Sequence, residues 1–104
     1  MKNSLTTSVS LTQQKKLTII HALYELIDQK NSEVVGLAKR LQCAVSEGIA
    51  GLELSKEEID YIIIALELAL KRTRDLGAER YGPFLSIIEL EKLTDDIRDL
   101  RKIF

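Results

Sequence analysis

The sequence has few of the residues from which small reactive or metal sites are usually built. It contains one cysteine, one histidine and no tryptophan among its 104 residues. A single cysteine excludes an internal disulfide, and one cysteine with one histidine excludes a zinc site made of Cys and His side chains alone. We therefore expect no metal ion and no cofactor, and a core that is stable without either.

Long hydrophobic runs are also lacking. The longest is Tyr61–Leu66, which ends at Glu67, whereas a membrane-spanning helix needs about 20 apolar residues. Residues 1–16 contain no apolar run of the length found in signal peptides. A lone thiol without an export signal is typical of the reducing cytoplasm. We expect this protein to act there, without entering a membrane.

An excess of charge of one sign is missing as well. Fifteen basic residues against sixteen acidic ones give a net charge of −1. Proteins that hold nucleic acid or anionic lipid by bulk charge carry a basic surplus, so this composition argues against both partners.

Helix-breaking residues are scarce, with five glycines and one proline, while Leu, Ile, Ala and Val supply most of the apolar residues. Hydrophobic periodicity and capping residues predict helices over residues 10–30, 32–47, 55–76 and 84–103. Residues 1–9 are rich in Ser and Thr and aperiodic, so we expect a flexible N-terminal arm there. The predicted fold is all-α, a single small four-helix bundle over residues 10–104.

Three capping boxes, each with a serine three residues before a Glu or Gln, mark helix starts. They are Ser10 with Gln13, Ser55 with Glu58 and Ser86 with Glu89. The last helix has two candidate starts, Pro83 in its first turn or Ser86 as its cap.

The helices over 55–76 and 84–103 are similar in length and joined by a short loop, which predicts an antiparallel hairpin. Both have acidic residues in their first turns and basic residues in their last turns. In an antiparallel pair each basic end lies beside the acidic start of its neighbour, whereas a parallel pair would place like charges together.

The helix over 55–76 is apolar around more than half of its circumference, at about 100° per residue. A helix this apolar has to contact several neighbours or a second copy of the protein. The candidate interaction residues on it are Tyr61, Ile64 and Leu68, and we expect a homodimer.

The loop before the last helix supplies the other candidates for protein contact. Arg80, Tyr81 and Phe84 flank a Gly-Pro turn, and aromatic and arginine side chains often anchor interfaces. The alternative interpretation is that Tyr81 and Phe84 close the end of the bundle.

His21 falls outside the apolar face of its helix and should be exposed. An exposed histidine on a helical bundle resembles the histidine-phosphotransfer domains, in which the imidazole carries a phosphoryl group. Those domains have a basic residue three positions after the histidine and a small one at the fourth, where this chain has Tyr24 and Glu25. Glu25 would repel a phosphoryl group. A solvent-facing side chain without a task is the alternative interpretation.

Residues 35–46 resemble the start of a helix-turn-helix unit, with Leu37-Ala-Lys-Arg-Leu41 before the turn. Neither Gln42 nor Cys43 breaks a helix at that turn, and the following segment has almost no basic residues to reach bases or phosphates.

Because catalytic residue types are nearly absent, we expect no enzyme. The sequence favours a non-catalytic protein-binding regulator of the inhibitor, immunity or adaptor type. A DNA-binding regulator and a phosphotransfer domain using His21 are the alternatives.

Overall fold

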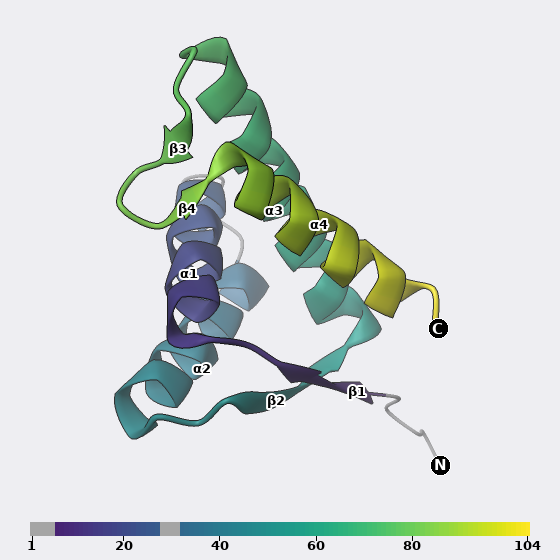
Figure 1. Ribbon diagram of the computed structural model, residues 1–104. Coiled ribbons are helices and arrows are strands. Elements are labelled where there is room, and N and C mark those ends of the chain that lie inside the picture. The colour runs from purple at the N-terminus through teal and green to yellow at the C-terminus, as the bar shows by residue number, and fades with distance from the viewer. Residues whose placement is uncertain (1–5, 28–31) are drawn as a thin grey trace.

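The computed structural model describes residues 6–27 and 32–104 of the chain. This part of the chain is mostly helical, with four helices and two small antiparallel sheets (Figure 1). In chain order the elements are β1 (Thr6–Ser10), α1 (Gln13–Ile27), α2 (Ser32–Glu47), β2 (Gly51–Ser55), α3 (Lys56–Asp75), β3 (Arg80–Tyr81), β4 (Leu85–Ser86) and α4 (Ile87–Arg101).

The predicted helices are present, with changes at their ends. Both capping boxes of the second half are formed, since Ser55 and Ser86 each cap a helix and exchange hydrogen bonds with the residue three positions on. The start of α4 at Ser86 is therefore the correct alternative to Pro83. The predicted cap at Ser10 is wrong, because Ser10 belongs to β1 and the Thr12 hydroxyl accepts from the Lys15 amide instead, at 3.2 Å. The predicted end of the first helix at residue 30 lies outside the described residues.

Strand β1 occupies the second half of the segment predicted to be a flexible arm, whereas residues 1–5 of that prediction lie outside the described residues. From Thr6 onward the chain pairs with β2 in antiparallel register, with Val9 opposite Leu52 and Thr7 opposite Leu54. Val9 and Leu54 are both buried, so this short ribbon covers part of the core. The partner strand comes much later in the sequence, and no local pattern in residues 6–10 predicts the pairing.

The segment before β2 is fastened to the start of α1. The Leu11 amide donates to the Ala50 carbonyl at 3.0 Å, and the buried Lys16 ammonium donates to the Ile49 carbonyl. The Ile49 side chain of this segment is exposed, whereas Leu52 is partly buried against the core and Leu54 in β2 is fully buried.

Helices α3 and α4 form the predicted antiparallel hairpin, as the ion pairs between them show. Asp60 near the start of α3 pairs with Arg101 at the end of α4 at 2.6 Å, and Arg74 near the end of α3 pairs with Glu91 near the start of α4 at 3.1 Å. Each basic end thus lies beside the acidic start of the other helix, as the charge pattern predicted.

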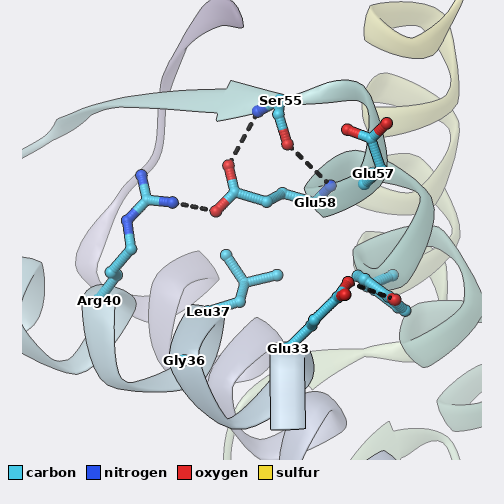
Figure 2. Close-up of a pocket in the computed structure, with 8 residues that line it drawn as sticks. Glu33, Gly36, Leu37, Arg40, Ser55, Glu57 and Glu58 are labelled. Carbon is cyan, nitrogen blue, oxygen red and sulfur yellow. Dashed lines mark hydrogen bonds and ion pairs between the residues drawn. The ribbon is translucent and has the colours of Figure 1, made fainter. Parts of the chain in front are cut away.

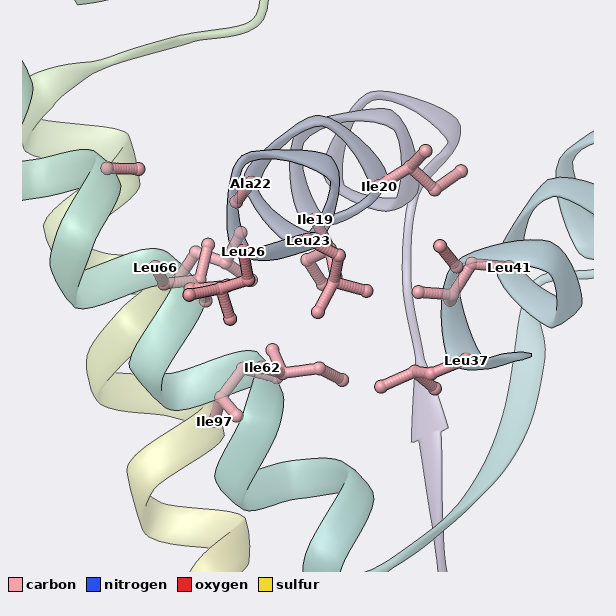
Figure 3. Packing of buried hydrophobic residues seen from close by; sticks show 14 of the residues in the cluster. Ile19, Ile20, Ala22, Leu23, Leu26, Leu37, Leu41, Ile62, Leu66 and Ile97 are labelled. Atoms are coloured by element: carbon pink, nitrogen blue, oxygen red, sulfur yellow. The ribbon is translucent and has the colours of Figure 1, made fainter. Parts of the chain in front are cut away.

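The main core lies where α1 packs on both α2 and α3 (Figure 3). Ile19, Leu23 and Leu26 of α1 meet Leu41 of α2 and Leu66 of α3 there, all buried. Helix α4 contacts mainly α3, so helix contacts follow the order α2, α1, α3, α4. No helix within residues 6–27 and 32–104 is both long and apolar enough to cross a bilayer.

Candidate functional site

The side of α3 that faces away from α1 and α4 carries three of the predicted interaction residues. Ile62 and Leu66 of α3 are fully buried in the core, and Asp60 and Glu67 pair with α4. At about 100° per residue, Tyr61, Ile64 and Leu68 lie together on a different side of the helix. We call this side, with Glu57 and Lys71 at its two ends, the outer face of α3.

Ile64 is the centre of the outer face. Its side chain is 51% exposed, whereas Tyr61 and Leu68 are partly buried against the edge of the core. The spacing of three and four residues places one apolar side chain on each turn, which is the pattern by which one helix packs on another.

A cleft opens at the N-terminal end of the outer face, between α2 and the start of α3 (Figure 2). Its volume is about 540 Å³, and Tyr61 forms part of its wall. The remaining lining residues are Glu33, Gly36, Leu37, Arg40, Ser55, Glu57 and Glu58. Three carboxylates against one guanidinium make the rim of the cleft acidic.

Hydrogen bonds fix the walls of the cleft. The Tyr61 hydroxyl donates to Glu33 Oε2 at 2.7 Å, which joins α3 to the first turn of α2. Arg40 of α2 donates to the Glu58 carboxylate (Figure 2). It also donates to the Glu53 carbonyl at 2.9 Å. Because Glu58 also completes the α3 capping box, the acidic rim is built into the start of the helix.

The opposite end of the outer face carries a lysine in an exposed ion pair. The Lys71 side chain is 74% exposed and pairs with Asp75 one turn later, at 3.1 Å. Exposed pairs of this kind contribute little free energy and exchange partners readily. The outer face therefore runs from an acidic cleft, over an apolar centre, to a lysine.

A second cluster joins His21 of α1 to the loop between α3 and α4. His21 Nδ1 lies 2.8 Å from the Tyr81 hydroxyl oxygen, and the Tyr81 hydroxyl donates to Glu25 Oε1. Arg72 of α3 pairs with the same Glu25 carboxylate. The Phe84 ring centroid is 5.0 Å from that of His21. Burial and the neighbouring Glu25 raise the pKa of the Tyr81 phenol well above its usual value.

His21 is held through its Nδ1 atom. This nitrogen lies beside the Tyr81 hydroxyl oxygen and 3.5 Å from Glu25 Oε1. The His21 side chain is 51% exposed, in agreement with the sequence-based expectation.

The six predicted interaction residues thus fall into two groups. Tyr61, Ile64 and Leu68 share the outer face of α3. Tyr81 and Phe84 instead pack on His21, and Tyr81 is only 7% exposed. Arg80 is exposed and donates to the Phe84 carbonyl at 3.4 Å. Sequence reasoning missed the contact of His21 with this loop and the α2–α3 cleft, since both depend on how distant segments meet.

The remaining candidates have a simpler environment. Cys43 is an exposed free thiol on α2, and in the described parts of the chain no three His, Cys, Asp or Glu side chains are grouped as metal ligands. Helix α2 continues through Gln42 and Cys43 without a turn, so the helix-turn-helix alternative gains no support.

Comparison with known proteins does not place this chain in a family. No protein-family model matches it, no curated protein matches it, and no solved structure matches it. We therefore infer its function from the residues on its own surface.

Proposed function

We propose that this protein is a non-catalytic regulator, of the inhibitor, immunity or adaptor type, that binds another protein through the outer face of α3. The observation that carries the proposal is the half-exposed Ile64 at the middle of α3, with Tyr61 and Leu68 beside it. A branched apolar side chain in this position is stabilised when a partner removes it from water.

The outer face has the properties that make a contact selective. Its apolar residues follow helical spacing, so they suit a partner that offers a helix or a shallow groove. Tyr61 is already held by Glu33, so it loses little conformational freedom on binding. Charged residues at both ends favour one orientation of the partner over the other.

The proposal also includes the architecture and the location of the protein. We propose a four-helix bundle with α1 and α3 at its centre, acting in the cytoplasm, where the exposed Cys43 would stay reduced. In the same proposal Tyr81 and Phe84 close the end of the bundle, because Tyr81 is buried and bonded to Glu25. Arg80 remains an exposed candidate for contact.

The test is photo-crosslinking in the source cell. A photoreactive amino acid at position 64 should give a discrete adduct with a protein, and the same group at position 88 should not. Ile88 is the matched control, since it is 77% exposed on the neighbouring α4. Equal adduct patterns from the two positions would contradict the proposal.

A second candidate function is acceptance of a phosphoryl group by His21. It is favoured by the half-exposed His21 side chain, which Tyr81 contacts through Nδ1, and by Arg72, which neutralises the Glu25 charge that would repel phosphate. Attack of Nε2 on acetyl phosphate would form an N–P bond and release acetate. Radiolabelling of the wild type that disappears in His21→Ala would support it, and the absence of label would exclude it.

A further inference from the structure

We propose that the partner on the outer face of α3 is a second copy of this chain, with the two α3 helices antiparallel across a twofold axis beside Ile64. This inference rests on the proposed function, because it names the occupant of the same face. The spacing and the charges of that face support it.

The outer face is self-complementary in its spacing. Glu57, Ile64 and Lys71 are separated by seven residues each, which is two helical turns or about 10.5 Å on either side of Ile64. A twofold axis beside Ile64 therefore places Glu57 of each copy opposite Lys71 of the other. It also brings Tyr61 of one copy close to Leu68 of the other, so the apolar centre is covered by itself.

The charges agree with this arrangement. The cleft rim, Glu57 included, contains three carboxylates and one arginine, and that arginine is bonded to Glu58. Lys71 is largely exposed and forms a surface ion pair with Asp75. A lysine from the second copy supplies the charge that the acidic end attracts, twice in each dimer.

The same charges exclude a parallel arrangement. Two parallel α3 helices would set Glu57 against Glu57 and Lys71 against Lys71, and like charges across a contact are unfavourable. A closed twofold contact also uses the same patch on both subunits, so the assembly ends at a dimer. The apolar area is small, which places this dimer among the weaker and reversible protein associations.

The experiment is sedimentation velocity on the full chain, from about 10 µM to about 1 mM, with two charge-reversal variants. Glu57→Lys and Lys71→Glu should each weaken the dimer about 10-fold, because each turns both attractive pairs into repulsive ones. An equimolar mixture of the two variants should associate as the wild type does, since the mixed dimer has two attractive Lys–Glu pairs again.

Two further variants distinguish loss of the dimer contact from loss of the fold. Ile64→Asp should be monomeric at every concentration while its circular dichroism stays that of the wild type. Ile88→Asp, an equally polar change at another exposed isoleucine, should dimerise normally.

Three results would overturn the inference. They are a wild type that stays monomeric throughout, a mixture that does not recover, and a dimer that is insensitive to Ile64→Asp. A monomeric wild type that still gives a crosslink from position 64 to a different protein would leave the proposed function intact and remove only the second copy as its occupant. No adduct from position 64 with any protein would reject both.

Discussion

Arg101, the last residue of α4, donates from its Nε to Oδ1 of Asp60, near the start of α3, at 2.6 Å. At the other end of the same helix pair, Arg74 pairs with Glu91 at 3.1 Å. The hairpin of α3 and α4 is therefore closed at both ends by opposite charges. This closure directs one side of α3 toward α4 and leaves the outer face with Ile64 on another side.

The pair Asp60–Arg101 should make a small, salt-dependent contribution to stability. In a double-mutant cycle with Asp60→Asn and Arg101→Gln, we expect a coupling energy of about 0.5 kcal/mol, because both side chains are partly exposed. The coupling should shrink in high salt. Urea unfolding measures it, and a coupling that is unchanged by salt would contradict an ionic origin.

The cap of α3 should matter more than an ordinary surface serine. Ser55→Ala removes the hydroxyl that accepts from the Glu58 amide and should lower the free energy of unfolding by about 1 kcal/mol. Ser46→Ala is the matched control, since Ser46 is exposed within α2 and should change stability by less than about 0.5 kcal/mol. Equal effects of the two changes would show that the capping box has no special role.

Strand β1 should contribute to the core. Val9 is buried opposite Leu52, so Val9→Ala should destabilise the protein by about 1 kcal/mol. Ser8→Ala, at an exposed position of the same strand, should leave stability unchanged. If thermal unfolding of the Val9 variant matches that of the wild type, residues 6–10 do not pack as described.

The buried Tyr81 phenol should make stability fall in alkaline solution. In the unfolded chain the phenol loses its proton near its usual pKa of 10.0, whereas burial and Glu25 keep it protonated in the folded protein. The folded state then binds more protons than the unfolded state above pH 10.0. Stability should therefore decrease by up to about 1.4 kcal/mol per pH unit from this group.

Tyr81→Phe should remove that part of the alkaline slope. Although the variant loses the hydrogen bonds to Glu25 and His21 and is less stable at neutral pH, its disadvantage should shrink as the pH rises. Urea unfolding between pH 9 and pH 11 follows the difference, as the usual phenol pKa of 10.0 lies within this range. Parallel pH profiles for the two proteins would contradict the assignment.

Local signals in the sequence predicted the helices and their pairing well. The capping boxes at Ser55 and Ser86 located two helix starts because a cap involves only neighbouring residues. The hairpin was predicted from the order of acidic and basic residues along α3 and α4. Strand β1 was missed because its hydrogen bonds go to β2, which lies far away in the sequence. The alternation that includes Thr7 and Val9 is too short to predict a strand by itself.

The candidate site was predicted in the same uneven way. Periodicity placed Tyr61, Ile64 and Leu68 on one helix, and the structure puts them on one face. The packing of α1 and α4 decides which side of α3 stays exposed. Periodicity alone does not predict that packing. The contact of Tyr81 with His21 depends on the path of the loop after α3, where the chain returns to α1.

The most direct test of the central claim is to measure the solvent accessibility of the Ile64 methyl groups by NMR. The paramagnetic relaxation that a soluble probe causes at these methyl groups reports their accessibility. The claim is that binding covers the outer face of α3. On going from dilute to concentrated protein, Ile64 should become protected while Ile88 stays accessible. Equal accessibility of both residues, in concentrated protein and in extract of the source cell alike, would contradict it.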